Sequence, residues 1–228
     1  MNGTAELRNK VATGSRILAR LGLTDYLGHV SARVPGTDTV LIKGRGAEVG
    51  NMLNTDAEHV VLVDLDAMPV EEGGVRPPDE TVLHTEIYRA RSDVMSVVHT
   101  HQALATAFGI AGRPILPMQG VTATVLARPL AVYESSRKIV TGEQGRQVAM
   151  ALGESLGIHL RHHGIVMTGP GVEEAVVNAI WLEDQAKMTL LATVLGNPEP
   201  MRQEEVEIQA KEMFGVAGRW NYYASLLG

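Results

Sequence analysis

Two histidines, His99 and His101, end a β-branched segment that begins at Val94. Because successive side chains of a strand point to opposite faces, both imidazoles are expected on the same side of this segment. Imidazole nitrogens bind zinc and other transition metals, so the pair supplies half of a metal site. The pair is weak by itself, because two strand-end histidines that contact only solvent or backbone give the same pattern.

A second group of histidines lies in the apolar segment 158–168, which is expected to form a strand or a strand pair. In an extended chain His159 and His163 share one face and His162 takes the other. Gly164 allows the backbone to pass close to a ligand or to another strand. Without further support, this segment is more typical of a histidine-rich strand than of a ligand set.

Glu80 is the candidate acidic group. Asp79 is expected to cap a helix that runs to about Arg91, which places Glu80 in its first turn. The helix dipole favours a carboxylate there, so an ordinary helix-start acid also explains it. His84 lies one turn later on the same face, where a core or supporting role is expected rather than metal binding.

Hydrophobic spacing and stop signals give the elements that must position these groups. Thr141 and Gln144 form a capping box, and Gly22, Gly153 and Gly196 follow helical segments. The alternation of helices and short strands, without a dividing linker, predicts one layered α/β domain. The expected helices are 7–21, 79–91, 103–108, 141–153 and 173–195, the expected strands are 40–43, 60–66, 94–101 and 158–168, and a helix with an aromatic tail follows.

Composition excludes several classes of protein. The chain has 228 residues, of which 45% are hydrophobic and 20% charged, which is typical of a globular protein. The net charge of −6, without a basic stripe, argues against a nucleic-acid partner. No apolar run is long enough for a bilayer and the N-terminus has no signal core, so we expect no membrane association and a cytoplasmic protein. The absence of Cys leaves histidines and carboxylates as metal ligands.

Together these segments resemble the class II aldolase/adducin family in order and spacing. The resemblance runs from segment 28–33 to Gly169, and its central positions are Glu80, His84, Tyr88, His99, His101, His163 and Gly164. It implies a single three-layer α/β domain over residues 1–228, with a central, mainly antiparallel sheet flanked by helices.

The resemblance also implies roles for the candidate residues. In the family's sugar-phosphate aldolases the paired histidines and the later one bind Zn²⁺, and the preceding acid is the catalytic base. Carried over, the metal ligands are His99, His101 and His163, with Glu80 as acid/base. His163 is chosen over His162 because the second of the adjacent histidines matches. One divalent ion per subunit is expected: Zn²⁺ first, with Mn²⁺, Co²⁺ or Fe²⁺ as alternatives.

Departures from the family pattern bear on the substrate. Where the phosphate-binding aldolases have Asn, Thr and Ser, this chain has His29, Lys43 and Asp79. An ionised Asp opposes a phosphate, whereas Arg45 suits a carboxylate through two parallel hydrogen bonds. Lys43 and Arg45 are equally compatible with solvated loop charges.

The Gly-His-x-Ser pattern, with His29 and Ser31, is more similar to the family's decarboxylases of hydroxylated aromatic or pyridine carboxylates. We therefore expect a metal-dependent carbon–carbon lyase that decarboxylates a small hydroxylated aromatic carboxylic acid such as a dihydroxyphthalate. The alternatives are a class II aldolase or epimerase acting on a sugar phosphate, a non-enzymatic adducin-like interaction module, and an Fe²⁺ oxygenase. Retention of the histidines and the acid argues against the adducin-like module.

The resemblance further implies a homotetramer with active sites at subunit interfaces. In that arrangement the tail, about 203–228, covers a neighbouring active site and places Tyr222 and Tyr223 in substrate binding. The alternative is a tail that packs against its own subunit.

Overall fold

The computed structural model describes residues 2–46, 51–71, 74–213 and 215–228. In this part of the chain seven strands form one sheet, in the order β3-β2-β1-β4-β7-β6-β5. Neighbouring strands are antiparallel except β5 and β6, which are parallel. The strands are β1 His29–Arg33, β2 Thr39–Lys43, β3 Val60–Asp64, β4 Ser96–Thr100, β5 Ala131–Tyr133, β6 Gly157–Leu160 and β7 Gly164–Gly169.

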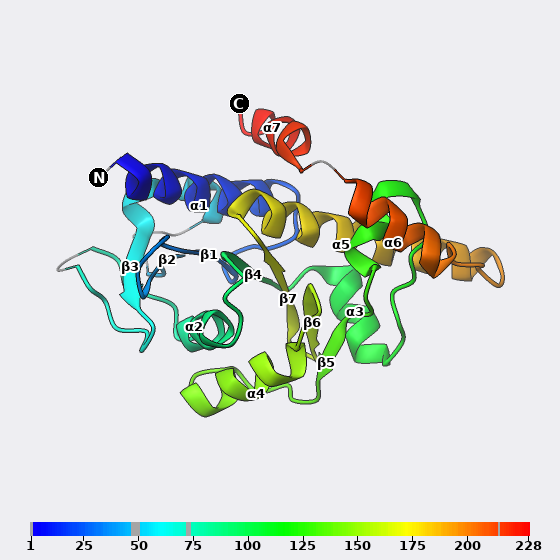
Figure 1. Ribbon diagram of the computed structural model, residues 1–228, viewed down its shortest axis with the longest axis horizontal. Helices are drawn as coiled ribbons and strands as arrows, with labels where there is room; N and C mark the ends of the chain where they lie inside the picture. Colours follow the sequence, from blue (N-terminus) through cyan, green and yellow to red (C-terminus); the bar gives the residue numbers. More distant parts are fainter. Residues whose placement is uncertain (1, 47–50, 72–73, 214) are drawn as a thin grey trace.

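Helices cover both faces of the sheet, which confirms the predicted three layers (Figure 1). One face carries α1 Asn2–Arg20, α3 Ala103–Ala111 and α5 Val172–Leu195, and the other carries α2 Thr81–Ala90 and α4 Gly142–Leu152. The chain ends with α6 Gln203–Glu212 and α7 Ala217–Ser225, and short 3₁₀ helices occupy Met52–Asn54, Ala57–His59 and Gly120–Leu126. No helix in the described ranges is both long and apolar enough to cross a membrane.

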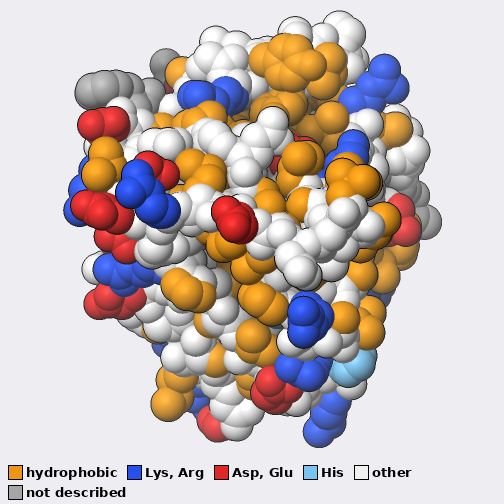
Figure 2. Space-filling model, turned by 90° about the vertical axis from the view of Figure 1, so that its right-hand side faces the viewer, with side chains coloured by type: hydrophobic (Ala, Val, Ile, Leu, Met, Phe, Trp, Pro, Cys, Tyr) orange, Lys and Arg blue, Asp and Glu red, His pale blue; other side chains and the backbone are white. Residues whose placement is uncertain are grey.

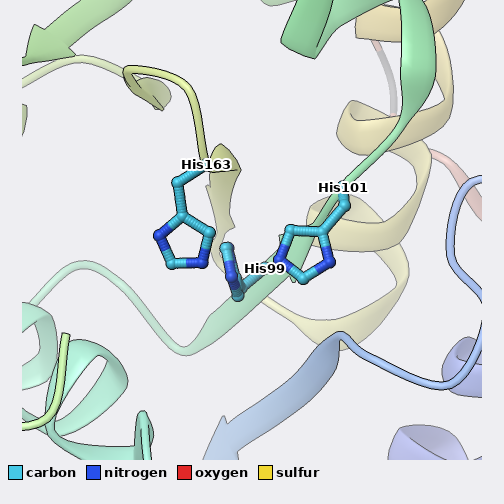
Figure 3. A group of neighbouring side chains, drawn as sticks. All are labelled: His99, His101 and His163. Atoms are coloured by element: carbon cyan, nitrogen blue, oxygen red, sulfur yellow. The ribbon is translucent and has the colours of Figure 1, made fainter. Parts of the chain in front are cut away.

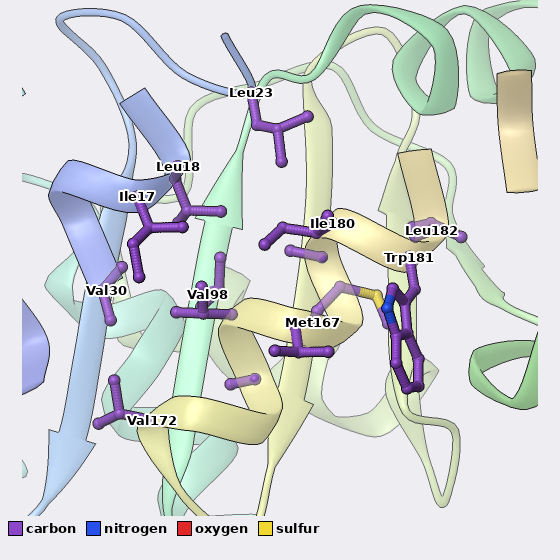
Figure 4. Packing of buried hydrophobic residues seen from close by; sticks show 14 of the residues in the cluster. Ile17, Leu18, Leu23, Val30, Val98, Met167, Val172, Ile180, Trp181 and Leu182 are labelled. Carbon is purple, nitrogen blue, oxygen red and sulfur yellow. The ribbon is translucent and has the colours of Figure 1, made fainter. Parts of the chain in front are cut away.

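The sheet separates two hydrophobic cores, because neighbouring strand residues face opposite sides. Val98 of β4 joins the core beneath α1 and α5, where Trp181 and Met167 are also buried (Figure 4). Val97, one residue earlier, joins the core between the sheet and α2 and α4. A side chain at position 99 therefore faces α2, at the strand end where the histidines gather.

The segment 158–168 forms a pair of strands rather than one. Thus β6 and β7 form an antiparallel hairpin, and the turn between them contains His162 with a φ of 59°. The prediction that His159 and His163 share a face is wrong, because the strand ends at Leu160 and the chain then reverses. His159 faces α3, where its Nδ1 would lie 2.9 Å from a Cβ added at Gly109.

The start of α2 also differs from the prediction. The N-cap is Glu80, whose side chain makes no capping hydrogen bond, so the assignment of Asp79 as the cap is wrong. Asp79 instead forms salt bridges with Arg45 and Lys138.

The capping box of α4 is confirmed: Thr141 Oγ1 accepts from Gln144 N–H at 3.3 Å, and Gln144 Oε1 accepts from Thr141 N–H at 3.1 Å.

The C-terminal tail is helical. Helix α7 lies against α1 and α5, and Tyr223 packs on the core beneath those helices. Tyr222 is 61% exposed, with its ring centroid 5.3 Å from that of Tyr223. Coverage of a neighbouring active site by this tail stays a prediction.

Candidate metal centre

Three histidines converge at the ends of the central strands (Figure 3). His99 is near the end of β4, His101 lies just beyond that end, and His163 completes the β6–β7 turn. One ring nitrogen from each lies within 4.8 Å of the others. The two imidazoles of the H-x-H pair thus lie on the same side, as strand alternation predicts.

His99 presents a free lone pair to this cluster. Its Nδ1 lies 2.8 Å from the carbonyl oxygen of Ile165 on β7, to which it donates a hydrogen bond. Burial, and then proximity to His101, holds the pKa of His99 well below its usual range, so the ring is neutral. With the proton on Nδ1, Nε2 is an unprotonated, fully buried nitrogen without a hydrogen-bond partner among the described residues. Such an atom is costly to bury unless something binds it.

The other two histidines are partly exposed and similarly deprotonated. Burial lowers the pKa of His101, and nearby His163 lowers it further. Burial also lowers the pKa of His163, although Glu80 acts in the opposite direction. Neutral imidazoles are the form that binds metal ions.

Gly164 makes the close approach of these histidines possible. A Cβ at this position would lie 2.5 Å from the carbonyl oxygen of Thr100 and 2.8 Å from Cδ2 of His101. Real Cβ atoms essentially never come this close to backbone. The predicted need for close backbone passage at Gly164 is therefore confirmed.

Glu80 directs its carboxylate at the same cluster. The residue is 4% exposed, and its Oε1 accepts a hydrogen bond from the Ile139 backbone N–H at 3.0 Å. Oε1 lies 3.6 Å from Nε2 of His163, and Oε2 lies 3.8 Å from Nε2 of His99. The acid thus borders the space between the histidines, held from one side by backbone.

Strand β1 supplies a second row of polar groups behind the cluster. His29 pairs with His99 across the β1–β4 ladder, and their ring centroids are 5.6 Å apart. Ser31, two residues on, lies 2.8 Å from Nδ1 of His84 and 2.7 Å from the hydroxyl of Tyr88. Burial lowers the pKa of His84 to about 3, so His84 is a neutral supporting residue, as expected.

Cationic side chains line a small cavity beside Glu80. This cavity, of about 60 Å³, is lined by His29, Lys43, Arg45, Asp79, Glu80 and Lys138 among others. Lys43 is 3% exposed, and burial lowers its pKa to about 8. Arg45 makes two contacts with Asp79, at 2.6 and 2.8 Å, which orient the guanidinium group and use two of its five N–H donors.

The sequence prediction missed Lys138, which also pairs with Asp79. The residue lies in the loop before α4, and no pattern marks it, because only the fold brings this loop to Glu80. Arg45 and Lys138 both pair with Asp79, so the charge of this carboxylate is neutralised and this end of the cavity has no net negative charge. Of the predicted site residues, Tyr222 and Tyr223 do not line this cavity in their own subunit.

The donor set fits a divalent transition metal. Neutral imidazoles, one with a buried lone pair that no described residue satisfies, suit Zn²⁺, Co²⁺, Mn²⁺ or Fe²⁺. Three histidine ligands leave a coordination position for a substrate, which is the pattern of catalytic rather than structural sites.

Comparison with known proteins agrees with this geometry. The sequence matches the Class II Aldolase and Adducin N-terminal domain over residues 9–190. The chain belongs to the class II aldolase and adducin family. Divalent-metal dependence is the rule for class II aldolases, and the three-histidine cluster of this family member accords with it.

Three relatives of this class II aldolase family member are informative. It is 34% identical to a 3,4-dihydroxyphthalate decarboxylase from Arthrobacter keyseri, over 84% of this chain and 81% of the relative. It is 32% identical to an L-ribulose-5-phosphate 4-epimerase from Salmonella paratyphi C, over 82% and 85%. An aldolase II superfamily protein from Pseudomonas syringae has the same fold, with a TM-score of 0.84, 28% identity, and coverage of 98% and 92%. These similarities support an enzyme.

Proposed function

We propose that this protein is a divalent-metal-dependent carbon–carbon lyase that decarboxylates a small hydroxylated aromatic carboxylic acid, such as a dihydroxyphthalate. The observation that carries the proposal is the convergence of Glu80 with His99, His101 and His163, in a chain 34% identical to 3,4-dihydroxyphthalate decarboxylases from two bacteria. Loss of CO₂ from such an acid needs a group that withdraws charge and a group that delivers a proton, and the site supplies candidates for both.

His99, His101 and His163 would hold the ion through their ring nitrogens. A bound divalent ion acts as a Lewis acid toward substrate oxygens. Glu80 is the proton donor: as the ring–carboxyl bond breaks, its electron pair stays on the ring carbon, which takes a proton from Oε2 of Glu80. Oε1 already accepts the Ile139 N–H, so the carboxyl orientation is fixed and Oε2 faces the reacting space. A proton from solvent then restores Glu80.

Lys43 and Arg45 are the proposed partners of a substrate carboxylate, with His29 and Ser31 lining or supporting the same end of the site. Lys43 is buried and lacks an ion pair in the described part of the chain, so an anionic substrate is the natural partner for its charge. Arg45 lies at the mouth of the cavity, where its pairing with Asp79 fixes the guanidinium plane. Protonated Lys43 and oriented Arg45 would position the carboxylate for loss of CO₂.

A sugar-phosphate epimerase or aldolase is the second candidate. Pairing of Asp79 with Arg45 and Lys138 favours it, because a neutralised Asp79 no longer opposes a phosphate. The relative named as an L-ribulose-5-phosphate 4-epimerase supports it as well. In that reaction Glu80 would remove or return a proton on the substrate.

We also propose a homotetramer in which Tyr222 and Tyr223 reach a neighbouring site. The exposure of Tyr222 on the outermost helix supports this arrangement, because the ring lacks a full cover within its own subunit.

A panel assay separates the two chemistries. Metal-loaded protein is incubated in parallel with 3,4-dihydroxyphthalate and with L-ribulose 5-phosphate, and CO₂ release and epimer formation are measured. The proposal requires CO₂ from the first and no turnover of the second. Epimerisation without CO₂ would replace it by the second candidate.

A further inference from the structure

A separate cavity lies on the other side of the sheet from the metal centre. It has a volume of about 260 Å³ and opens between α3 and the β5–β6 edge of the sheet. His159 and Arg161 contribute to it from β6 and the following turn, and Arg113 contributes from the segment after α3. None of these residues lines the cavity beside Glu80.

His159 is a buried polar residue on the wall of this cavity. The residue is 5% exposed, and Nδ1 makes no hydrogen bond to any described residue. Burial, and then the charge of Arg161, lowers the pKa of His159 to about 4, so the ring is neutral at pH 7. Because Nδ1 packs against Gly109, a ligand in the cavity would meet the rest of this neutral ring, whose Nε2 can donate or accept a hydrogen bond.

Two guanidinium groups give the cavity a positive charge. Nε of Arg161 lies 2.7 Å from a carboxylate oxygen of Glu134, whereas both of its Nη atoms lie beside Gly112, 3.6 Å from where a Cβ would stand. Arg113 forms no salt bridge to a described carboxylate. With Arg161 balanced by Glu134, the cavity keeps about one net positive charge, which suits a monoanion.

The remaining walls are apolar and match a single ring. They are formed by Phe108, Pro114, Ile115, Pro129 and Leu130. Cavities of about 150 Å³ already accept benzene, so 260 Å³ has room for one ring with a carboxylate. Figure 2 shows the side of the molecule that carries the end of α5 and α6, where exposed hydrophobic side chains lie with Lys and Arg among them.

We propose that this cavity binds a small aromatic monocarboxylate, with the carboxylate between Arg113 and Arg161, a hydrogen bond to His159, and the ring between Phe108 and Leu130. Guanidinium groups bind carboxylates through parallel hydrogen bonds, and the apolar walls exclude water from the ring. This site does not depend on the proposed reaction. The cavity and the metal centre are linked through the backbone, because Arg161 and His163 belong to the same three-residue turn.

The test is a calorimetric titration of the full-length protein with benzoate. We expect a dissociation constant of about 1 mM, in line with a ligand of this size. Arg113→Gln should weaken binding at least about tenfold, as should Arg161→Gln, because each loses a charged hydrogen-bond donor. The matched control is Arg137→Gln, an exposed arginine outside the cavity, which should leave the affinity unchanged.

Three further titrations fix the ligand class and the location. Benzamide, which lacks the charge, and inorganic phosphate, which lacks the ring, should each bind at least tenfold more weakly than benzoate. Benzoate binding should persist after the metal is removed by a chelator. Absence of binding, unchanged affinity in Arg113→Gln, equal affinity for phosphate, or loss of binding with the metal would each overturn the proposal. Arg113 is exposed, so its variant should fold even if Arg161→Gln does not.

Discussion

Oε1 of Glu80 lies 3.6 Å from Nε2 of His163, although one residue begins a helix and the other completes a hairpin turn. The backbone N–H of Ile139 holds the same oxygen from a third segment. The acid is therefore placed by three separate parts of the chain, which is more than helix capping requires.

Glu80→Gln should abolish most turnover while the metal content stays unchanged. The amide keeps an oxygen for the Ile139 N–H but cannot transfer a proton, and loss of a general acid/base costs on the order of 10²–10⁴-fold. Turnover and metal stoichiometry are measured on the same preparation. A variant with nearly wild-type turnover would return Glu80 to an ordinary helix-start role.

His163→Ala should lose stoichiometric metal, whereas His162→Ala should keep it. The two residues are adjacent in one turn, but His163 joins the cluster and His162 is exposed with a φ of 59°. Elemental analysis after dialysis reports the metal content of both variants. Equal retention by the two proteins would contradict the assigned ligand set.

Gly164→Ala should destabilise the fold and impair metal binding. The new methyl group would meet the Thr100 carbonyl at 2.5 Å, and overpacking of this kind costs about 1–3 kcal/mol. Gly218→Ala is the control, because no atom of the described residues lies within 4 Å of a Cβ there. Denaturant unfolding gives both free energies, and equal values for the two variants would show that the turn tolerates a side chain.

Lys43→Met should raise the free energy of unfolding at pH 7. Burial lowers the pKa of Lys43 from 10.5 to about 8, so between these values the unfolded chain binds a proton that the folded chain has lost. The free energy of unfolding of the wild-type protein therefore rises between about pH 8 and pH 10.5. Below about pH 8 it is reduced by the full cost of burying the charged Lys43 side chain. The variant removes that cost, up to about 3 kcal/mol, together with the rise.

The control for this comparison is Lys211→Met on the exposed side of α6, which should change neither the stability nor its pH dependence. In the enzyme assay Lys43→Met should raise KM, because the carboxylate loses its buried cation. Reduced stability of Lys43→Met at pH 7 would show that the charge has a partner in the folded protein.

Local patterns in the sequence predicted the layers and most of the histidine cluster. Strand alternation placed His99 and His101 together, and the capping box located the start of α4. The error at His159 arose because an apolar run does not show where a hairpin turns. The error at Asp79 arose because Arg45 and Lys138, which draw its side chain away from the helix, come from distant segments.

Tertiary contacts supplied what local patterns could not. Lys138 reaches the site only because the loop before α4 crosses Glu80, and the spacing of residues gives no sign of this. The resemblance to class II aldolases linked Glu80 to the histidines before the structure did, since their segments lie far apart in the chain.

The most direct test of the central claim measures labelled CO₂ released from carboxyl-labelled 3,4-dihydroxyphthalate. The protein is stripped of metal with a chelator and then titrated with Zn²⁺, Mn²⁺ or Co²⁺. We predict no release from the stripped protein, and release that rises with added metal to a plateau at one ion per chain, with one dihydroxybenzoate formed per CO₂. Release that is independent of metal, or no release at full metal occupancy, would contradict the proposed metal-dependent decarboxylase.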